Sequence, residues 1–284
     1  MSYARIIALT SLAMIAFAGN SLLCRAALKH TSIDAASFTT IRLISGAVML
    51  WLLVQTSGRT RSGGGNWLSA LALFVYAAGF SFAYVSLSAA TGALLLFGAV
   101  QATMIGHGIW TGERLMRLQI VGLILAFGGL VGLLLPGLSA PPLYGSILML
   151  GAGVAWGVYS LRGKGAGDPT SVTAGNFLRA APISAALSVL MFSSTSLDNA
   201  GFWYAVSSGA LASGIGYAIW YTALPTLKST NAATVQLSVP VIAALGGIVF
   251  LGEPITLRLS LASIAILGGI ALVILEKQHA KGAQ

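Results

Sequence analysis

The stretch LILAFGGLVGLLL at 123–135 decides the fold, because a closely similar stretch, SIAILGGIALVIL, follows at 263–275. Both stretches are uncharged, and the Gly-Gly pair of the first aligns with that of the second at a shift of 140 residues. Self-similarity at a fixed distance along a chain indicates a structural repeat. We therefore expect two related halves, 1–139 and 140–284.

The composition places this repeat in a membrane. Charged residues make up 7% of the 284 residues, against roughly 25% in soluble domains, while 57% are hydrophobic and the mean hydropathy is +0.89. So little charge cannot cover a water-facing surface. The composition excludes a soluble enzyme and a disordered chain, and the single cysteine, Cys24, excludes a disulfide scaffold. The prediction is an all-α polytopic membrane protein.

Ten transmembrane helices are predicted from the uncharged intervals, since a spanning helix needs about 20 mostly apolar residues. The intervals 62–112 and 118–161 are each long enough for two helices, and each has a helix breaker near its middle, at 86–91 and 136–142. The expected helices are 4–24, 34–55, 66–86, 91–111, 117–135, 143–162, 171–192, 201–224, 230–251 and 257–275.

Lysine and arginine indicate how the chain crosses the membrane. With a cytoplasmic N-terminus, ten of the 15 basic residues fall on the inner side and only Arg25, Lys29 and Arg258 on the outer side. The positive-inside rule therefore predicts that both termini are cytoplasmic. This pattern explains the net charge of +9, so no nucleic-acid partner is expected. The expected partners are the lipid bilayer and a small-molecule substrate.

Each half contains five helices, which is an odd number. The second half therefore enters the membrane from the opposite side, and the two halves are predicted to be inverted repeats. Such repeats supply similar gates at both faces around a site near the membrane midplane, as alternating access requires.

The ten helices, the TGERL and LGEPI sequences at 111–115 and 251–255, and Arg42 in the second helix resemble the EamA-type drug/metabolite transporter superfamily. Within it, the chain is most similar to bacterial exporters of amino acids and metabolites, of the aromatic amino-acid type. The resemblance implies a cavity among helices 1, 3, 4, 6, 8 and 9 in the bacterial cytoplasmic membrane, with no cofactor or metal. One departure is Pro240 in the ninth helix, since Val100 is its repeat counterpart.

Polar and aromatic residues within the spans are the candidates for lining a cavity, because burying an unpartnered polar group in hydrocarbon is costly. Asn20 could instead satisfy a backbone group or a neighbouring helix. Tyr84, near the end of its span, is expected in the interfacial aromatic belt. The predicted substrate-binding residues are Asn20, Tyr76, Phe80, Phe97, Gln101, Met104, Trp156, Tyr159, Tyr217, Trp220 and Gln236.

Two ion pairs between the halves are predicted from the leaflet that each residue occupies. Arg42 shares the outer leaflet with Glu253, and Arg179 shares the inner leaflet with Glu113. Both pairs would lie at gates. The alternative is that each arginine extends to its nearest interface and each glutamate is solvated.

The mode of coupling rests on one histidine and on the positions of the acids. His107 is the only histidine within a predicted span, which suggests proton coupling; the alternative is a neutral side chain bonded to a neighbouring helix. All six acids fall at helix ends or in loops. A facilitator of amino acids or similar metabolites is therefore favoured over a carboxylate-coupled antiporter, with a proton-coupled exporter of drugs or other metabolites as the alternative.

An intramembrane enzyme is the rival class. A rhomboid-type protease needs a serine followed by an intramembrane histidine, but Ser213 comes after His107, and no H-E-x-x-H sequence is present. No enzymatic activity is therefore expected. The glycines of helices 5 and 10 would allow close packing, either within one chain or in a homo-oligomer.

Overall fold

The structure, a computed structural model, describes residues 2–56, 64–112, 115–137, 139–163, 167–227 and 235–282, with side chains as far as Leu275. Within these ranges the chain forms helices joined by short connections, with no strand. Seven helices are long and apolar enough to cross a membrane, which confirms the all-α membrane fold. They are α1 (Tyr3–His30), α2 (Ala35–Thr56), α3 (Trp67–Tyr84), α4 (Ala89–Trp110), α5 (Arg117–Leu134), α6 (Leu143–Arg162) and α12 (Leu257–Gly282).

The other three predicted spans are more polar, broken or only partly described. α7 (Pro169–Leu190) carries a proline inside the helix. The eighth span is a continuous rod that includes a π-helical segment, and the ninth is described from Val235, so its expected start lies outside the described residues. These parts are η1 (Phe192–Ser194), α8 (Asn199–Ser207), the π-helix η2 (Ser208–Ile215), α9 (Gly216–Ala223), η3 (Leu224–Thr226) and α11 (Ser238–Leu251).

The first helix is longer than predicted. It was expected to end at residue 24, but α1 continues to His30 and is capped at Thr31, whose backbone N–H donates to the carbonyl of Ala27. No glycine or proline interrupts residues 25–30, so nothing in the chain stops the helix earlier. Arg25 and Lys29 consequently lie on helix α1 rather than in a loop.

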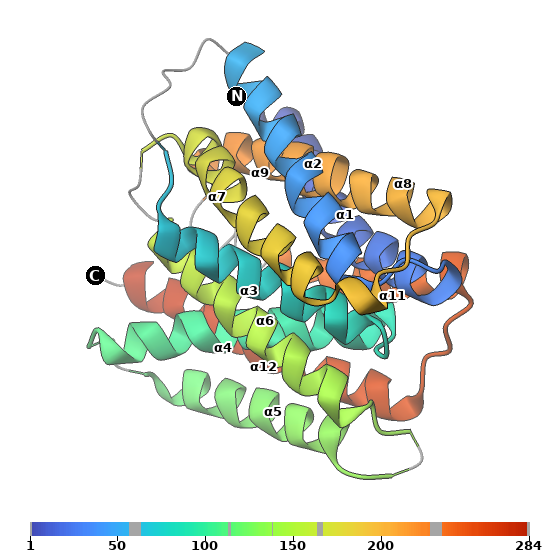
Figure 1. The fold of residues 1–284 in the computed structure, drawn as a ribbon. Coiled ribbons are helices and arrows are strands. Elements are labelled where there is room, and N and C mark those ends of the chain that lie inside the picture. Colours follow the sequence, from blue (N-terminus) through green and yellow to red (C-terminus); the bar gives the residue numbers. More distant parts are fainter. Residues whose placement is uncertain are drawn as a thin grey trace.

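The helices pack as a bundle with one pair at its side, as Figure 1 shows. α5 contacts mainly α12 at one edge of the bundle, and the remaining helices surround its centre. The main contacts are α2 with α7, α3 and α4 with α6, and α1 with both α9 and α11. Each contact has a counterpart when every helix is replaced by the helix at the same place in the other half. For example, the contact of α3 with α6 corresponds to that of α9 with α1. Two repeats of five helices would give this pattern. The division at residue 139 stays a prediction.

Glycines allow α5 and α12 to approach within one chain. A Cβ atom built on Gly122 would lie 2.5 Å from the carbonyl oxygen of Gly269, and one built on Gly269 would lie 2.4 Å from that of Gly122. Only glycine fits at either position, because the obstructing atoms are backbone. By contrast, a Cβ on Gly128, Gly132 or Gly268 would meet nothing within 4 Å. Their role in a homo-oligomer stays a prediction.

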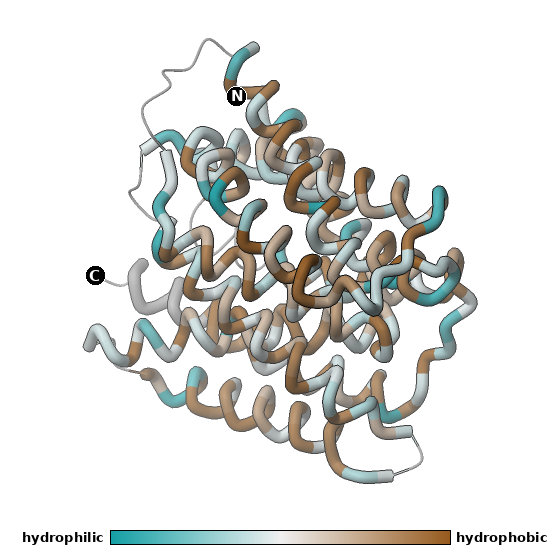
Figure 2. Tube along the Cα trace, viewed as in Figure 1, coloured by the Kyte–Doolittle hydropathy of each residue, from teal (hydrophilic) through white to brown (hydrophobic). Residues whose placement is uncertain are grey.

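The outer surface of the bundle is apolar along the middle of its helices. Large side chains such as Ile124, Phe127 and Ile264 are about two-thirds exposed or more, at 67%, 68% and 71%. Figure 2 shows hydrophobic residues along the helices and hydrophilic ones mainly near their ends and in the connections. In water such a surface would drive aggregation, whereas lipid tails solvate it.

Candidate functional site

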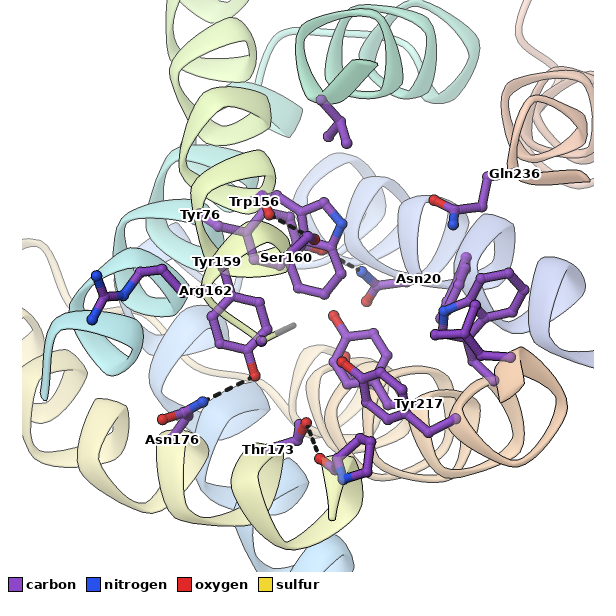
Figure 3. A pocket seen from close by; sticks show the side chains of 18 of the residues that line it. Asn20, Tyr76, Trp156, Tyr159, Ser160, Arg162, Thr173, Asn176, Tyr217 and Gln236 are labelled. Carbon is purple, nitrogen blue, oxygen red and sulfur yellow. Dashed lines mark hydrogen bonds between the residues drawn. The ribbon is translucent and has the colours of Figure 1, made fainter. Parts of the chain in front are cut away.

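A cavity of about 570 Å³ lies inside the bundle. Its walls come from α1, α3, α4, α6, α9 and the described start of the ninth span, and also from η2 and the beginning of α7. All eleven residues predicted to bind substrate line this cavity, and several of them are drawn in Figure 3. They are Asn20, Tyr76, Phe80, Phe97, Gln101, Met104, Trp156, Tyr159, Tyr217, Trp220 and Gln236.

Aromatic rings form one wall of the cavity. The ring of Trp156 lies 5.3 Å from those of both Tyr159 and Tyr217, nearly parallel to each at 26° and 25°. Tyr76 approaches the same indole at 4.7 Å. These rings come from α3, α6 and α9, so a small molecule in the cavity would contact flat faces contributed by both halves of the chain.

Asn20 connects this wall to the neighbouring helices. Its Nδ2 donates to the hydroxyl of Tyr76 at 3.4 Å, and its Oδ1 accepts from the hydroxyl of Ser208 at 2.6 Å. Asn20 therefore lines the cavity and also bonds to α3 and η2, while its role in substrate binding stays a prediction. Its amide is held in one orientation by these two bonds.

The π-helix η2 brings one serine to the cavity that was not predicted from the sequence. Ser213 lines the cavity, is 1% exposed, and its hydroxyl has no hydrogen-bond partner among the described residues. The segment lies against α2 at Gly209, where an added Cβ would come within 2.1 Å of the carbonyl oxygen of Arg42. The only signal for this close approach in the sequence is the small-residue run SSGALASGIG at 207–216.

One end of the cavity reaches the ends of several helices. Arg162, exposed at the end of α6, donates from Nε to the hydroxyl of Ser69 at 3.2 Å and from Nη2 to Oδ1 of Asn66 at 3.3 Å. On α7, Nδ2 of Asn176 donates to the hydroxyl of Tyr159 at 3.3 Å. Four of these residues also line the cavity and were not predicted: Asn66, Ser69, Arg162 and Asn176. No acidic residue lies among the described lining residues.

An ion pair ties the helices together at the opposite end. Nε of Arg25 lies 2.9 Å from Oε1 of Glu253, and its Nη1 donates to the carbonyls of Tyr84 and Val85 at 2.9 and 3.1 Å. The other oxygen of Glu253 accepts from the backbone N–H of Ala89 at 2.7 Å. This group, made of Arg25, Glu253 and these three backbone positions and called the Arg25 cluster below, joins α1, the end of α3, the start of α4 and the connection that follows α11.

The predicted pair of Arg42 with Glu253 is therefore wrong. Because α1 continues past residue 24, Arg25 reaches the carboxylate, while Arg42 is 1% exposed and turned toward Tyr76. The expectation for Tyr84 is also wrong: it is fully buried, packs edge-on against Phe80 at 4.7 Å, and does not lie in an interfacial belt.

The second predicted pair is untested, because Glu113 lies outside the described residues. Arg179 donates from Nη1 to the carbonyls of Gly64 and Gly175, at 3.0 and 2.9 Å. His107 is exposed near the end of α4 and does not line the cavity, so its role in proton coupling stays a prediction. No group of three His, Cys, Asp or Glu residues that could hold a metal occurs in the described ranges.

Comparison with known proteins gives the family. The model of the EamA-like transporter family matches residues 143–275. An uncharacterised protein of Pseudomonas aeruginosa is 59% identical over 95% of this chain and 94% of its own length. An uncharacterised transporter of Archaeoglobus fulgidus is 27% identical over 86% of this chain and 89% of its own length.

Two further proteins show how far the similarity extends. The threonine/homoserine exporter RhtA of Escherichia coli K12 is 34% identical over 49% of this chain and 48% of its own length. A crystal structure of a protein that is 19% identical covers 99% of this chain and 100% of its own, with a TM-score of 0.69, so the two share a fold. The chain is a multi-pass membrane protein and a member of the EamA-like transporter family.

Proposed function

We propose that this protein exports amino acids, or similar small metabolites, across a bacterial cytoplasmic membrane by alternating access, without coupling to a proton gradient. The observation that carries the proposal is a cavity that extends to one end of the bundle, at Arg162, while Arg25 and Glu253 tie the helices together at the other. With both termini cytoplasmic, the end at Arg162 faces the cytoplasm. An exporter would take up its substrate from that side.

The chemistry of the cavity supports a small zwitterion. Its volume of about 570 Å³ lies within the range for small-molecule sites, roughly 300 to 1,000 Å³. Gln101, Gln236 and Ser213 offer neutral hydrogen-bonding groups beside the rings. The similarity of about half the chain to a threonine/homoserine exporter supports amino acids as substrates. The absence of an acid among the described lining residues supports facilitated transport.

Transport is tested by counterflow in proteoliposomes with labelled L-threonine, L-homoserine and L-phenylalanine. Trp156→Ala removes the centre of the ring wall, and we expect it to lower the flux by about tenfold or more, the effect of losing on the order of 1.4 kcal/mol of binding. The matched control is Phe127→Ala, which removes a lipid-facing ring that is 68% exposed. Equal flux in the two variants would contradict the site. Flux driven by a pH gradient would contradict facilitation and favour the proton-coupled alternative.

The orientation is tested separately with introduced cysteines. Cys24, the only native cysteine, is fully buried and contributes little background. A membrane-impermeant maleimide added to intact spheroplasts is expected to label Ser139→Cys, in the connection between α5 and α6. It is expected not to label Met116→Cys, before α5, until the membrane is broken. The reverse pattern would place both termini outside the cell, and the end of the cavity at Arg162 would then face outward, against the proposed orientation.

A further inference from the structure

A buried positive charge lies directly behind the cavity wall. Arg42 on α2 is 1% exposed and does not itself line the cavity. Its Nη2 donates to the hydroxyl of Tyr76 at 2.9 Å, while its Nε and Nη1 have no partner among the described residues. The carboxylate of Glu253 is bonded to Arg25 instead. An unpaired guanidinium is costly in a protein interior, so its presence within a transmembrane helix points to a function.

The aromatic residues in front of Arg42 belong to the cavity. The guanidinium carbon lies 5.2 Å from the ring centre of Tyr76 and 4.8 Å from that of Phe80, and both rings line the cavity. The charge of Arg42 is thus separated from the cavity by one layer of side chains. Ring faces attract a cation only weakly compared with a carboxylate, so most of the charge is left for an incoming anion to neutralise.

The hydroxyl of Tyr76 links the guanidinium of Arg42 to the cavity. Its oxygen accepts from Nη2 of Arg42 and from Nδ2 of Asn20, at 2.9 and 3.4 Å. A phenol oxygen has two acceptor positions and one hydrogen, so the remaining hydrogen is a donor for which the described structure shows no acceptor. Figure 3 shows Tyr76 beside Asn20 at the cavity. A donor polarised by a neighbouring guanidinium is strengthened toward an anion.

We propose that the hydroxyl of Tyr76, with Arg42 behind it, is a subsite for a carboxylate, and that the protein recognises its substrate by this group. The inference rests on the proposed function and names the end of the amino acid that is bound. A carboxylate would accept the free hydrogen of Tyr76 and would bring a negative charge beside an unpaired guanidinium. A phosphate is disfavoured, because its higher charge would need several inward cations, whereas Arg42 is the one buried cation behind this wall in the described structure.

The ammonium group of an amino acid has no comparable partner. No described lining residue is acidic, so an ammonium would meet ring faces, hydroxyl groups and amide oxygens but no negative charge. Selection should therefore depend on the carboxylate much more than on the amine. The subsite predicts that 3-phenylpropanoate, which keeps the carboxylate, binds, and that phenethylamine, which keeps only the amine, does not.

Binding to the purified full-length protein is measured by quenching of intrinsic fluorescence, since Trp156 lies 4.7 Å from Tyr76. The ligands are L-phenylalanine, L-threonine, their carboxamides, 3-phenylpropanoate and phenethylamine. We expect the three carboxylates to bind at least about tenfold more tightly than the carboxamides and the amine, a difference of ~1.4 kcal/mol.

Variants assign this preference to the two residues. Arg42→Gln and Tyr76→Phe are each expected to reduce the ratio of carboxylate to carboxamide affinity to near one, and Arg42→Lys to restore part of it. The matched control is Arg179→Gln, which removes an arginine of the second half that bonds to Gly64 and Gly175, and which should leave the ratio unchanged. If Arg42→Gln does not fold, the result for Tyr76→Phe tests the carboxylate subsite, because this variant keeps the ring and the guanidinium.

The outcomes separate this inference from the proposed function. If carboxamides bind as tightly as carboxylates, or if Arg179→Gln changes the ratio as much as Arg42→Gln, the subsite is wrong even where amino acids are transported. If 3-phenylpropanoate binds with dependence on Tyr76 while neither amino acid binds, amino-acid export is wrong and the carboxylate subsite stands. If none of the three carboxylates binds, the subsite is overturned.

Discussion

At the scale of single residues, two serines on the π-helix carry out different tasks. Ser208 donates to Oδ1 of Asn20 at 2.6 Å, whereas the hydroxyl of Ser213 is buried at the cavity without a described partner. A buried hydroxyl without a partner costs stability, and a satisfied one contributes to it. We therefore expect the hydroxyl of Ser213 to find its partner in a ligand that occupies the cavity.

The two serines provide a matched pair of substitutions. Ser208→Ala should lower the stability by about 1 to 3 kcal/mol, because it leaves the Asn20 carbonyl oxygen without its donor. Ser213→Ala should leave the stability unchanged or slightly raised, and should weaken binding of substrates that bear a hydroxyl. Thermal unfolding in detergent and counterflow of L-threonine measure the two effects. A loss of stability in Ser213→Ala equal to that in Ser208→Ala would contradict this assignment.

Asp34 makes the stability sensitive to acid. Its Oδ1 accepts from the backbone N–H groups of Ala36 and Ser37, both at 2.9 Å, and its Oδ2 accepts from that of Ser196 at 3.0 Å. Burial raises the pKa of this carboxyl, but the hydrogen bonds from Ser37, Ser196 and Ala36 outweigh burial and hold the pKa below its usual value of 3.8. The contribution of Asp34 is thus complete at neutral pH and is lost as the pH falls through the lowered pKa.

Replacement of Asp34 should show this pH dependence. Asp34→Ala removes the N-cap of α2 and should lower the stability by about 1 kcal/mol at pH 7. The difference in unfolding temperature between wild type and variant should then shrink as the pH is lowered below 4. Thermal unfolding in detergent at a series of pH values measures it. A difference that stays constant down to pH 3 would mean that the carboxylate form contributes nothing.

At the scale of elements, the sequence predicts the helices and the cavity lining well, but it does not predict which charged residues pair with each other. Tyr76, Trp156 and Gln101 could be selected because rings and amides stand out within apolar spans. Ser213 could not, since a serine among glycines and alanines reads as a packing residue, and a π-helix departs from the period of 3.6 on which face assignments rest. The pairing of Arg42 failed because a misplaced helix end removed Arg25 from consideration.

The crossing of η2 with α2 depends on Gly209. A Cβ at this position would come within 2.1 Å of the carbonyl oxygen of Arg42 and of Oγ of Ser45. Since the carbonyl is backbone and cannot turn away, Gly209→Ala should separate the two elements, displace Arg42 and lower stability by about 1 to 3 kcal/mol, as overpacking does.

Gly128→Ala in α5 is the matched control for this change. Nothing lies within 4 Å of the added methyl group there, so the intrinsic preference of helices for alanine should leave stability unchanged or raise it by up to about 1 kcal/mol. Unfolding temperatures in detergent and the carboxylate-to-carboxamide affinity ratio measure both variants. Equal behaviour of the two would show that the close approach at Gly209 is not needed.

At the scale of the whole molecule, the two ends of the bundle differ in how they are held. The Arg25 cluster joins four helices through one ion pair and three bonds to backbone groups, around a carboxylate that is 6% exposed. At the opposite end, the cavity reaches exposed residues of α6. With both termini cytoplasmic, as proposed, this conformation faces inward, and the proposed alternating access requires that the Arg25 cluster separates when the substrate leaves.

The native Cys24 reports on this separation, since it is fully buried beside Arg25 in the sequence. Glu253→Gln removes the negative charge from the Arg25 cluster while keeping the shape of the side chain. We expect it to raise the rate at which an externally added thiol reagent modifies Cys24 by about tenfold, if on the order of 1.4 kcal/mol of the closed state is lost. The matched control is Asp198→Asn, which changes a carboxylate that caps α8. Both rates are measured at one pH by mass spectrometry in proteoliposomes. If Cys24 reacts at the same rate in the two variants, the ion pair of Arg25 with Glu253 does not hold this end of the bundle closed. Packing of the surrounding helices must then do so instead.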